Sequence, residues 1–213
     1  MDASFWHAKW ERGEIGFHNS EANPALVRCY DHLGLEQGQR VFLPLCGKTL
    51  DIAWLLDKGL RVVGAELSEK AIQGLFHELG VEPDIRQVGS LLLYQAEALD
   101  IFVGDIFDLS ADVLGAVDAI YDRAALVALP PALRQQYTVH LRTITATARQ
   151  LVICYEYDQE QRNGPPFSVA SEEVHQHYDD YYRLSLLETQ DVAGVMKNRL
   201  TAHETVWALQ PLV

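Results

Sequence analysis

Short apolar runs and amphipathic stretches alternate along the chain, which predicts strands that alternate with helices. The clearest unit has an apolar run at residues 41–45, a turn that contains a glycine, an amphipathic stretch at 50–56 and a second apolar run at 61–66. This arrangement is typical of a βαβ unit, in which a helix connects two parallel strands.

Similar patterns extend on both sides of this unit. Helices are expected at residues 4–18, 24–33, 69–80, 130–148 and 171–182, and strands at 98–105, 117–122 and 150–157. Hairpins are expected at residues 81–96 and, near the end of the chain, at 183–189 with 204–209. Asn23 and Ser68 are expected to cap the helices that follow them. The order of elements predicts a doubly wound α/β fold, with a mostly parallel sheet and a final antiparallel hairpin.

The second strand of the βαβ unit ends on a carboxylate. Glu66 lies 19 residues after the glycine of the turn, Gly47. In nucleotide-binding βαβ units an acidic residue about 20 residues past the glycine turn accepts hydrogen bonds from ribose hydroxyls. Glu66 is therefore the first candidate for cofactor binding.

The turn at residues 45–50 excludes two classes of phosphate site. A dinucleotide site needs three glycines that let the backbone approach a pyrophosphate, and this turn has one. A P-loop needs a further glycine where this chain has Phe42, so Lys48 is expected to be a solvated residue of the first helical turn. A ribose-binding carboxylate beside such a turn suits an adenosine that carries no phosphate, and S-adenosylmethionine is such a ligand.

Two later strands also end on charged residues. Asp105 ends the strand at 98–105, where it either binds the cofactor or caps the next turn. Arg123 follows Asp122 at the end of another strand, at the edge where open α/β sheets bind their ligands. A guanidinium there can hold a carboxylate or stabilise a developing anion. The alternative for Arg123 is an ion pair with Asp122 at the surface.

Several motifs occur in order along the chain: residues 41–48, 64–68, 104–109, 121–126 and 164–167, together with Trp6, Lys9, Trp10 and the Phe17-His18 pair. In these motifs the chain resembles the thiopurine S-methyltransferases, and in particular the bacterial members of this family. The end of the chain matches more loosely.

The resemblance implies a class I S-adenosylmethionine-dependent methyltransferase fold with a seven-stranded sheet. It implies one domain over residues 1–213, with residues 1–20 as a lid, whereas the spacing of Trp6 and Trp10 by itself indicates a packed helix. His18 is expected to be a polar neighbour of the lid. The cofactor is expected to be S-adenosylmethionine, contacted by Trp10, Leu45, Glu66 and Arg123, with Asp105 and Ile106 beside the adenine. Arg123 is also the expected catalytic residue, with an orienting or electrostatic role.

Composition narrows the choice of partners. The formal net charge of −13 and the pI of about 4.9 disfavour nucleic acid, because nucleic-acid binding draws on clustered Lys and Arg. No apolar run approaches the roughly 20 residues that span a bilayer, and charged residues interrupt any N-terminal signal sequence. We therefore expect a cytoplasmic monomer with no membrane partner.

The three cysteines are Cys29, Cys46 and Cys154. Their wide spacing and odd number argue against a disulfide framework or a thiolate zinc site, so we expect them to be reduced. Cys46 is expected to be a small buried side chain rather than a nucleophile. No cluster of metal ligands is visible in the sequence.

The expected reaction is methyl transfer to the sulfur of thiopurines and related aromatic or heterocyclic thiols, and also to selenium or tellurium compounds. A sulfonium methyl group is already electrophilic and a thiolate is a good nucleophile, so in-line positioning suffices without a metal or a strong base. Two alternatives stay open. One is a nicotinamide-dependent reductase, against which the missing glycines count, and the other is a non-catalytic protein that binds the cofactor or a chalcogen compound.

Overall fold

The structure is a computed structural model that describes residues 3–16, 18–192 and 201–212. These residues form a nine-stranded sheet in the order β3-β4-β5-β2-β1-β6-β7-β9-β8. The strands are β1 (Arg40–Pro44), β2 (Arg61–Glu66), β3 (Asp84–Val88), β4 (Leu91–Ala96), β5 (Leu99–Val103), β6 (Ala119–Arg123), β7 (Arg149–Tyr157), β8 (Tyr182–Asp191) and β9 (Ala202–Pro211). The α-helices are α1 (Ala3–Arg12), α2 (Pro24–Cys29), α3 (Asp51–Asp57), α4 (Glu69–Leu79), α5 (Ala111–Leu114), α6 (Pro131–Ile144) and α7 (Ser171–Tyr178). Short 3-10 turns are η1 (Tyr30–Leu33), η2 (Ile106–Asp108), η3 (Leu126–Ala128) and η4 (Gln159–Gln161).

The centre of the sheet is parallel and both of its edges are antiparallel. β1 pairs in parallel with β2 and β6, β2 with β5, and β6 with β7. The terminal hairpin β8-β9 is antiparallel, as predicted, and it joins the sheet through an antiparallel pairing of β9 with β7. The expected number of seven strands was wrong, because the hairpin β3-β4 also joins the sheet by pairing β4 with β5. Leu91 and Leu93 of that hairpin are buried in the core, which fixes it to the sheet edge.

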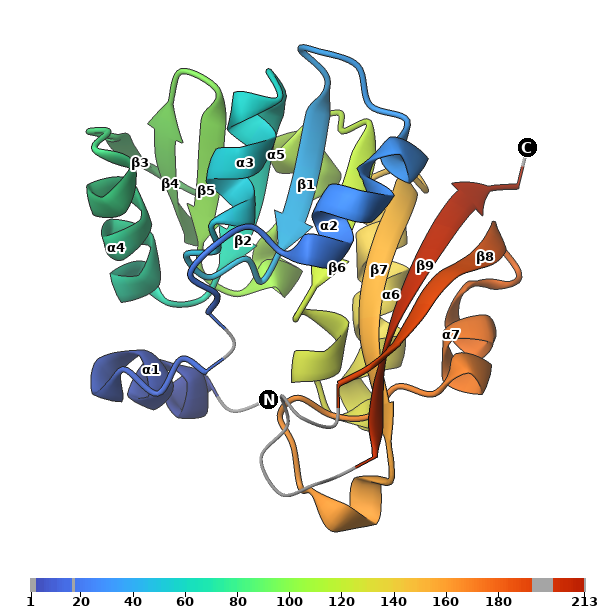
Figure 1. Ribbon diagram of the computed structural model, residues 1–213. Coiled ribbons are helices and arrows are strands. Elements are labelled where there is room, and N and C mark those ends of the chain that lie inside the picture. The colour runs from blue at the N-terminus through green and yellow to red at the C-terminus, as the bar shows by residue number, and fades with distance from the viewer. Residues whose placement is uncertain (1–2, 17, 193–200, 213) are drawn as a thin grey trace.

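Helices cover both faces of the sheet, as Figure 1 shows. On one face, α2, α3 and α4 bury Leu26, Ile52 and Ile72 against the strands. On the other face, α6 and α7 bury Tyr137 and Val174. Each helix hides one apolar stripe, so the fold is a three-layer α/β sandwich with a separate core on each side of the sheet.

The predicted helix starts are confirmed. The Asn23 side chain accepts hydrogen bonds from the amides of Ala25 (2.8 Å) and Leu26 (3.4 Å), and Ser68 Oγ accepts one from the amide of Ala71 (3.3 Å). A capping oxygen of this kind satisfies amides that have no partner within the helix.

Three predicted helix ends were wrong. α1 ends at Arg12 rather than near residue 18, and Gly13 after it has a left-handed φ of 66°. α6 ends at Ile144 rather than near residue 148, because Ala146 and Thr147 have left-handed φ values of 51° and 60° that a helix does not accommodate. α7 ends at Tyr178, and Tyr182, which was expected in the helix, begins β8. The Tyr182 hydroxyl accepts a hydrogen bond from the Gln150 side chain of β7 at 2.8 Å, and this buried contact holds it against the sheet.

All five parallel strands end at the same edge of the sheet, and α1 lies beyond that edge (Figure 1). The loop that follows β7 starts there too. Strand order reverses between β1 and β6, and open α/β sheets bind ligands at the carboxyl ends of strands beside such a reversal. Within the described ranges, no helix combines the length and the apolar character needed to cross a membrane.

Candidate functional site

A cavity of about 1170 Å³ opens at this edge of the sheet. All six predicted site residues line it, and they come from five different segments of the chain. These residues are Trp10, Leu45, Glu66, Asp105, Ile106 and Arg123. The structure therefore brings together every residue of the predicted site.

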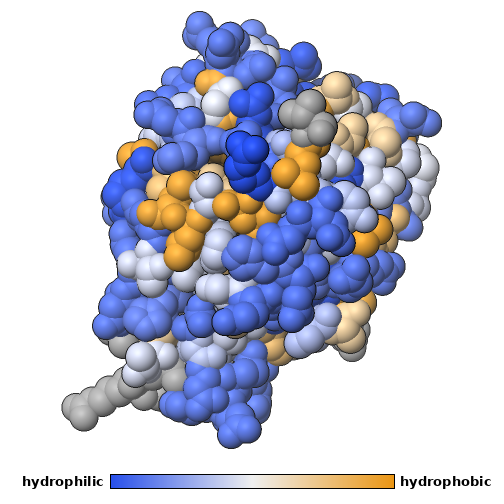
Figure 2. All heavy atoms as spheres, turned by 90° about the vertical axis from the view of Figure 1, so that its right-hand side faces the viewer, coloured by the Kyte–Doolittle hydropathy of each residue, from blue (hydrophilic) through white to orange (hydrophobic). Residues whose placement is uncertain are grey.

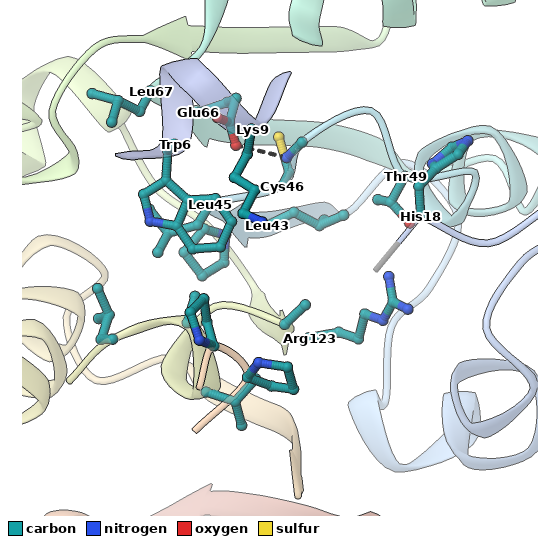
Figure 3. Close-up of a pocket in the computed structure, with 18 of the residues that line it drawn as sticks. Trp6, Lys9, His18, Leu43, Leu45, Cys46, Thr49, Glu66, Leu67 and Arg123 are labelled. Atoms are coloured by element: carbon teal, nitrogen blue, oxygen red, sulfur yellow. Dashed lines mark hydrogen bonds between the residues drawn. The ribbon is translucent and has the colours of Figure 1, made fainter. Parts of the chain in front are cut away.

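Glu66 is held in place by the backbone around it. Its Oε2 accepts a hydrogen bond from the amide of Gly47 at 2.8 Å, dashed in Figure 3, and its Oε1 accepts one from the amide of Ser68 at 2.8 Å. The residue is 7% exposed. Burial raises the pKa of the carboxyl group, while the amides of Ser68, Gly47 and Leu67 lower it. A carboxylate oxygen can accept more than one hydrogen bond, so both oxygens can still receive donors from a ligand.

The turn that follows β1 is tightly packed against Glu66. Leu45 has a left-handed φ of 47°, which is costly for a residue with a side chain, and Gly47 has a φ of 54°. Cys46 is buried, and burial together with the nearby Glu66 raises the pKa of its thiol well above its usual range. The prediction that Cys46 is a small buried side chain is confirmed, and the residue also lines the cavity.

Lys48 differs from the sequence-based expectation of a solvated side chain. Its ammonium group pairs with Glu78 of α4, and its side chain is 18% exposed. His18 also lines the cavity, and burial, followed by the charge of Lys48, lowers the pKa of its imidazole. A lowered pKa favours the neutral ring near pH 7. Phe17, the other residue of the predicted pair, lies outside the described residues.

α1 covers the cavity from outside the sheet. Trp6 and Lys9 point into the cavity in Figure 3, and Trp10 is buried with 7% of its surface exposed. Lys9 is held by an ion pair to Glu14 (Nζ to Oε2, 2.7 Å) in the segment that follows the helix. Both tryptophans therefore face the site, and movement of this segment stays a prediction.

Asp105, at the end of β5, caps the next turn and also lies in the wall of the cavity. Its Oδ1 accepts a hydrogen bond from the amide of Phe107 at 3.0 Å and so caps the turn η2, while the residue also lines the cavity. Ile106 is buried and presents an apolar side chain beside it. The carbonyl oxygen of Ile106 is bonded by Nε2 of His140 in α6 at 2.8 Å, which fixes this part of the wall.

The alternative of a surface ion pair between Asp122 and Arg123 was wrong. Asp122 is fully buried, and it accepts hydrogen bonds from the amide of Leu126 (3.0 Å) and the hydroxyl of Tyr137 (2.7 Å). Burial raises the pKa of this carboxyl group to about 6. Ala124 has a left-handed φ of 61°, so the chain turns sharply after Arg123. Arg123 faces the cavity and makes no ion pair within the described part of the chain.

Several polar residues of the cavity were not identified from the sequence. Asp51 is buried and accepts hydrogen bonds from the amide of Asn23 (2.6 Å) and the hydroxyl of Tyr121 (3.1 Å). Tyr155 and Glu204 also line the cavity. In the sequence these residues stand within or beside apolar runs, and nothing local indicates which face of the sheet they occupy. Across the described residues, no group of three His, Cys, Asp or Glu side chains is placed to hold a metal ion.

Comparison with known families matches residues 1–210 of the chain to the family described as Thiopurine S-methyltransferase. A relative named Thiopurine S-methyltransferase from Xanthobacter autotrophicus is 50% identical over 211 residues, covering 99% of both chains. Another of that name from Teredinibacter turnerae is 50% identical over 209 residues, covering 98% of this chain and 97% of the relative.

Solved structures show the same fold. The chain is similar to a 1,6-didemethyltoxoflavin-N1-methyltransferase from Burkholderia thailandensis, solved with 1,6-didemethyltoxoflavin and S-adenosylhomocysteine bound (TM-score 0.67, 17% identity, 99% of this chain and 87% of that one). It is also similar to a SAM-dependent methyltransferase from Anabaena variabilis (TM-score 0.61, 12% identity, 99% of this chain and 95% of that one). At these identities the likeness concerns the fold, and it confirms the predicted fold class.

Proposed function

This chain belongs to the thiopurine S-methyltransferase family, and we propose that it transfers a methyl group from S-adenosylmethionine to the sulfur of thiopurines and related aromatic or heterocyclic thiols. The observation that carries the proposal is the Glu66 carboxylate, buried at the end of β2 and held toward the cavity by two amides. The turn beside it has one glycine, which fits an adenosine without phosphate groups.

The residues around Glu66 fit the rest of this cofactor. Glu66 accepts hydrogen bonds from the ribose hydroxyls, and Asp105 and Ile106 flank the adenine at the end of β5. Leu45 and Trp10 supply apolar and aromatic surface, and an aromatic face near a cation contributes about 0.5–2 kcal/mol. When bound, S-adenosylmethionine supplies a methyl group that its positive sulfonium makes electrophilic.

The chain's own part in the reaction is positioning, exclusion of water and control of charge. Arg123 faces the cavity without an ion pair among the described residues, so its guanidinium is available to attract and orient an anionic sulfur. Trp6 and Trp10 cover the site from α1 and keep water away from the reacting atoms. A thiolate held in line with the methyl group needs little further activation.

The same reasoning supports selenium and tellurium acceptors. Selenolates and tellurolates are softer nucleophiles than thiolates, and a site that works by positioning demands no proton transfer from them. We therefore include these compounds in the proposed substrate range, and we propose that the protein acts as a monomer in the cytoplasm on small molecules.

Mass spectrometry of product tests the proposal. The protein is incubated with S-adenosylmethionine and, in turn, an aryl thiol, the matching selenol and the matching tellurol, with reactions lacking protein as the background. Methylated thiol in molar excess over the protein is expected. A protein that binds S-adenosylhomocysteine but gives no product above background with any of the three would be a binding protein instead.

A further inference from the structure

Four polar or charged side chains line the cavity from four neighbouring strands: Arg123 of β6, Tyr155 of β7, Glu204 of β9 and Gln190 of β8. Tyr155 and Gln190 are the register partners of Glu204 on its two sides. Arg123 is the register partner of Ile153, two residues before Tyr155, so it leaves the same face of the sheet. Opposite side chains of paired strands lie about 5 Å apart and diagonal ones about 7–8 Å apart. The four therefore form one polar row across the sheet, in which Arg123 is the diagonal neighbour of Tyr155.

This polar row holds opposite charges that are not joined in an ion pair. Arg28 of α2 is occupied by Glu188 (Nη2 to Oε2, 2.7 Å), whereas neither Arg123 nor Glu204 has an ion-pair partner in the described ranges. Burial raises the pKa of the Glu204 carboxyl group, and Glu188 adds to this, while Tyr155, Arg123 and Arg28 lower it. A half-buried carboxylate and a guanidinium thus line one cavity without forming an ion pair with each other.

A ligand that fits between these charges needs an electron-rich atom for Arg123 and a hydrogen-bond donor for Glu204. A heteroaromatic thione has both, because its exocyclic sulfur carries partial negative charge and its ring nitrogen carries a hydrogen. We propose that Glu204 binds the ring N–H of a heteroaromatic thione acceptor and takes its proton during methylation, while Arg123 faces the sulfur. This inference rests on the methyl transfer proposed above and assigns a catalytic residue to it.

The step balances as follows. The thione sulfur forms a bond to the methyl carbon, and the bond between that carbon and the donor sulfur breaks with its electron pair left on the donor sulfur. The electron pair of the ring N–H bond stays on the nitrogen as a lone pair in the plane of the ring, and the proton passes to the Glu204 carboxylate. The π electrons that nitrogen shares with the thione form the ring C=N bond as the C=S bond becomes single, so the ring is aromatic. The products are a neutral methyl thioether, the neutral donor thioether and a protonated Glu204.

The test compares two acceptors of the same ring size in the Glu204→Gln variant. 2-Thiopyridone carries a ring N–H beside its sulfur, and thiophenol carries none. For 2-thiopyridone, kcat/KM should fall by about tenfold or more, the loss expected for a hydrogen bond to a charged group, and thiophenol should change by less than about threefold. Calorimetry on protein saturated with S-adenosylhomocysteine should show a similar loss of 2-thiopyridone affinity. Glu156→Gln, on β7 but absent from the cavity wall, is the matched control and should change neither acceptor.

A pH profile separates a proton acceptor from a structural residue. In the unsubstituted protein, kcat/KM for 2-thiopyridone should fall as the pH drops through the raised pKa of Glu204, because only the ionised carboxylate accepts the proton. Glu204→Gln should lack this acid limb. A measurement without any variant is the binding of N-methyl-2-thiopyridone, which lacks the hydrogen and should bind the S-adenosylhomocysteine complex about tenfold more weakly than 2-thiopyridone.

Equal losses for the two acceptors, no loss for either, or equal binding of the N-methyl compound would overturn the role of Glu204 while leaving methyl transfer intact. If the unsubstituted protein binds S-adenosylhomocysteine but methylates neither acceptor, the proposed function fails and this inference fails with it.

Discussion

At Glu66 two opposing effects act on one carboxyl group. Burial favours the neutral acid, whereas the amides of Gly47 and Ser68 favour the carboxylate that a ribose needs as an acceptor. The two amides thus replace part of the hydration that the Glu66 carboxylate loses when it is buried. The same two amides orient both oxygens, so little freedom remains to be lost when a ligand binds.

Replacing Glu66 by alanine should weaken binding of S-adenosylhomocysteine by more than about tenfold, since each hydrogen bond to a charged group contributes about 1.5–3 kcal/mol. Isothermal titration calorimetry measures this, with Glu66→Gln as a second variant that keeps an acceptor oxygen for the turn. Glu82→Ala, an exposed carboxylate away from the cavity, is the control. Unchanged affinity in a folded Glu66 variant would remove this residue from the site.

Activity should depend on the planar shape of the Arg123 guanidinium as well as on its charge. Lysine keeps the charge but loses the planar fork, so Arg123→Lys should lower kcat/KM for a thiopurine, and Arg123→Ala should lower it further. Arg61→Lys, at the exposed start of β2, should leave the rate unchanged. Full activity of Arg123→Ala would contradict the catalytic role, and a loss confined to S-adenosylhomocysteine affinity would assign the residue to the cofactor.

At the scale of residues, the sequence predicted relations between residues within one local unit and missed relations between distant parts of the chain. Glu66 was predicted because its relation to Gly47 follows from one local βαβ unit. The partner of Lys48 is Glu78 on another helix, and the position of Glu204 depends on the register of β9 against β7. Neither relation has a signal in the local pattern.

At the scale of elements, the connection from β6 to η3 shows how a turn presents a side chain. The buried Asp122 carboxylate binds the amide of Leu126 and the hydroxyl of Tyr137, and so holds the sharp turn after Arg123. Alternation along β6 directs Asp122 into the core and Arg123 into the cavity. The side chains of Asp122 and Arg123 therefore lie on opposite faces of β6.

The stability of the Asp122→Asn variant should depend on pH differently from that of the unsubstituted protein. The pKa of Asp122 rises from 3.8 to about 6 on folding, so its stabilising contribution is complete below pH 3.8 and is lost as the pH rises toward about 6. Asparagine does not ionise, and the variant should therefore gain roughly 3 kcal/mol relative to the unsubstituted protein across this window. Urea unfolding at several pH values measures the difference. The exposed Asp112→Asn control should show no such trend.

Segment 3–16 should order when the cofactor binds. Its link to α4 includes an ion pair between Lys70 and Glu11 (2.8 Å) whose side chains are 51% and 67% exposed, and exposed pairs contribute about 0–1 kcal/mol. Weakly held elements exchange amide hydrogens fastest and gain most from a ligand. Hydrogen exchange between Trp6 and Gly16 should slow when S-adenosylhomocysteine is added, while α6 should change little. Equal protection in both states would identify α1 as a static packing helix.

Element types were predicted better than element ends. Strong periodicity located each parallel strand. α6 ends earlier than predicted because Ala146 and Thr147 have left-handed backbone conformations, which alanine and threonine rarely adopt and which the sequence therefore does not predict. The hairpin at 81–96 was predicted, but its place in the sheet was not, because pairing of β4 with β5 depends on packing of the whole edge.

At the scale of the whole molecule, strand order places the site. β1 lies between β2 and β6, so their connections leave in opposite directions and open a space at the carboxyl ends. Leu45 follows β1 and Arg123 ends β6, so a residue that we propose contacts the cofactor and a residue that we propose orients the acceptor lie on opposite sides of this reversal. The alternating pattern predicted a doubly wound, mostly parallel sheet, since parallel crossovers allow few arrangements.

The open edges of the sheet, β3 and β8, bear on the oligomeric state. An unpaired edge strand invites pairing with another chain unless charged residues interrupt it, and β8 carries Arg183, Glu188 and Asp191. Figure 2 shows that this side of the molecule is mainly hydrophilic, with a group of hydrophobic residues near its middle. Leu186 of β8 is 48% exposed. A net charge of −13 adds repulsion between copies. Light scattering after size exclusion at neutral pH should therefore give the monomer mass of 24.0 kDa. Near the pI of about 4.9 the net charge and its repulsion vanish, so association at that pH alone would agree with this reasoning. A stable dimer at neutral pH would contradict it and would show that a second chain covers an edge strand or an apolar patch.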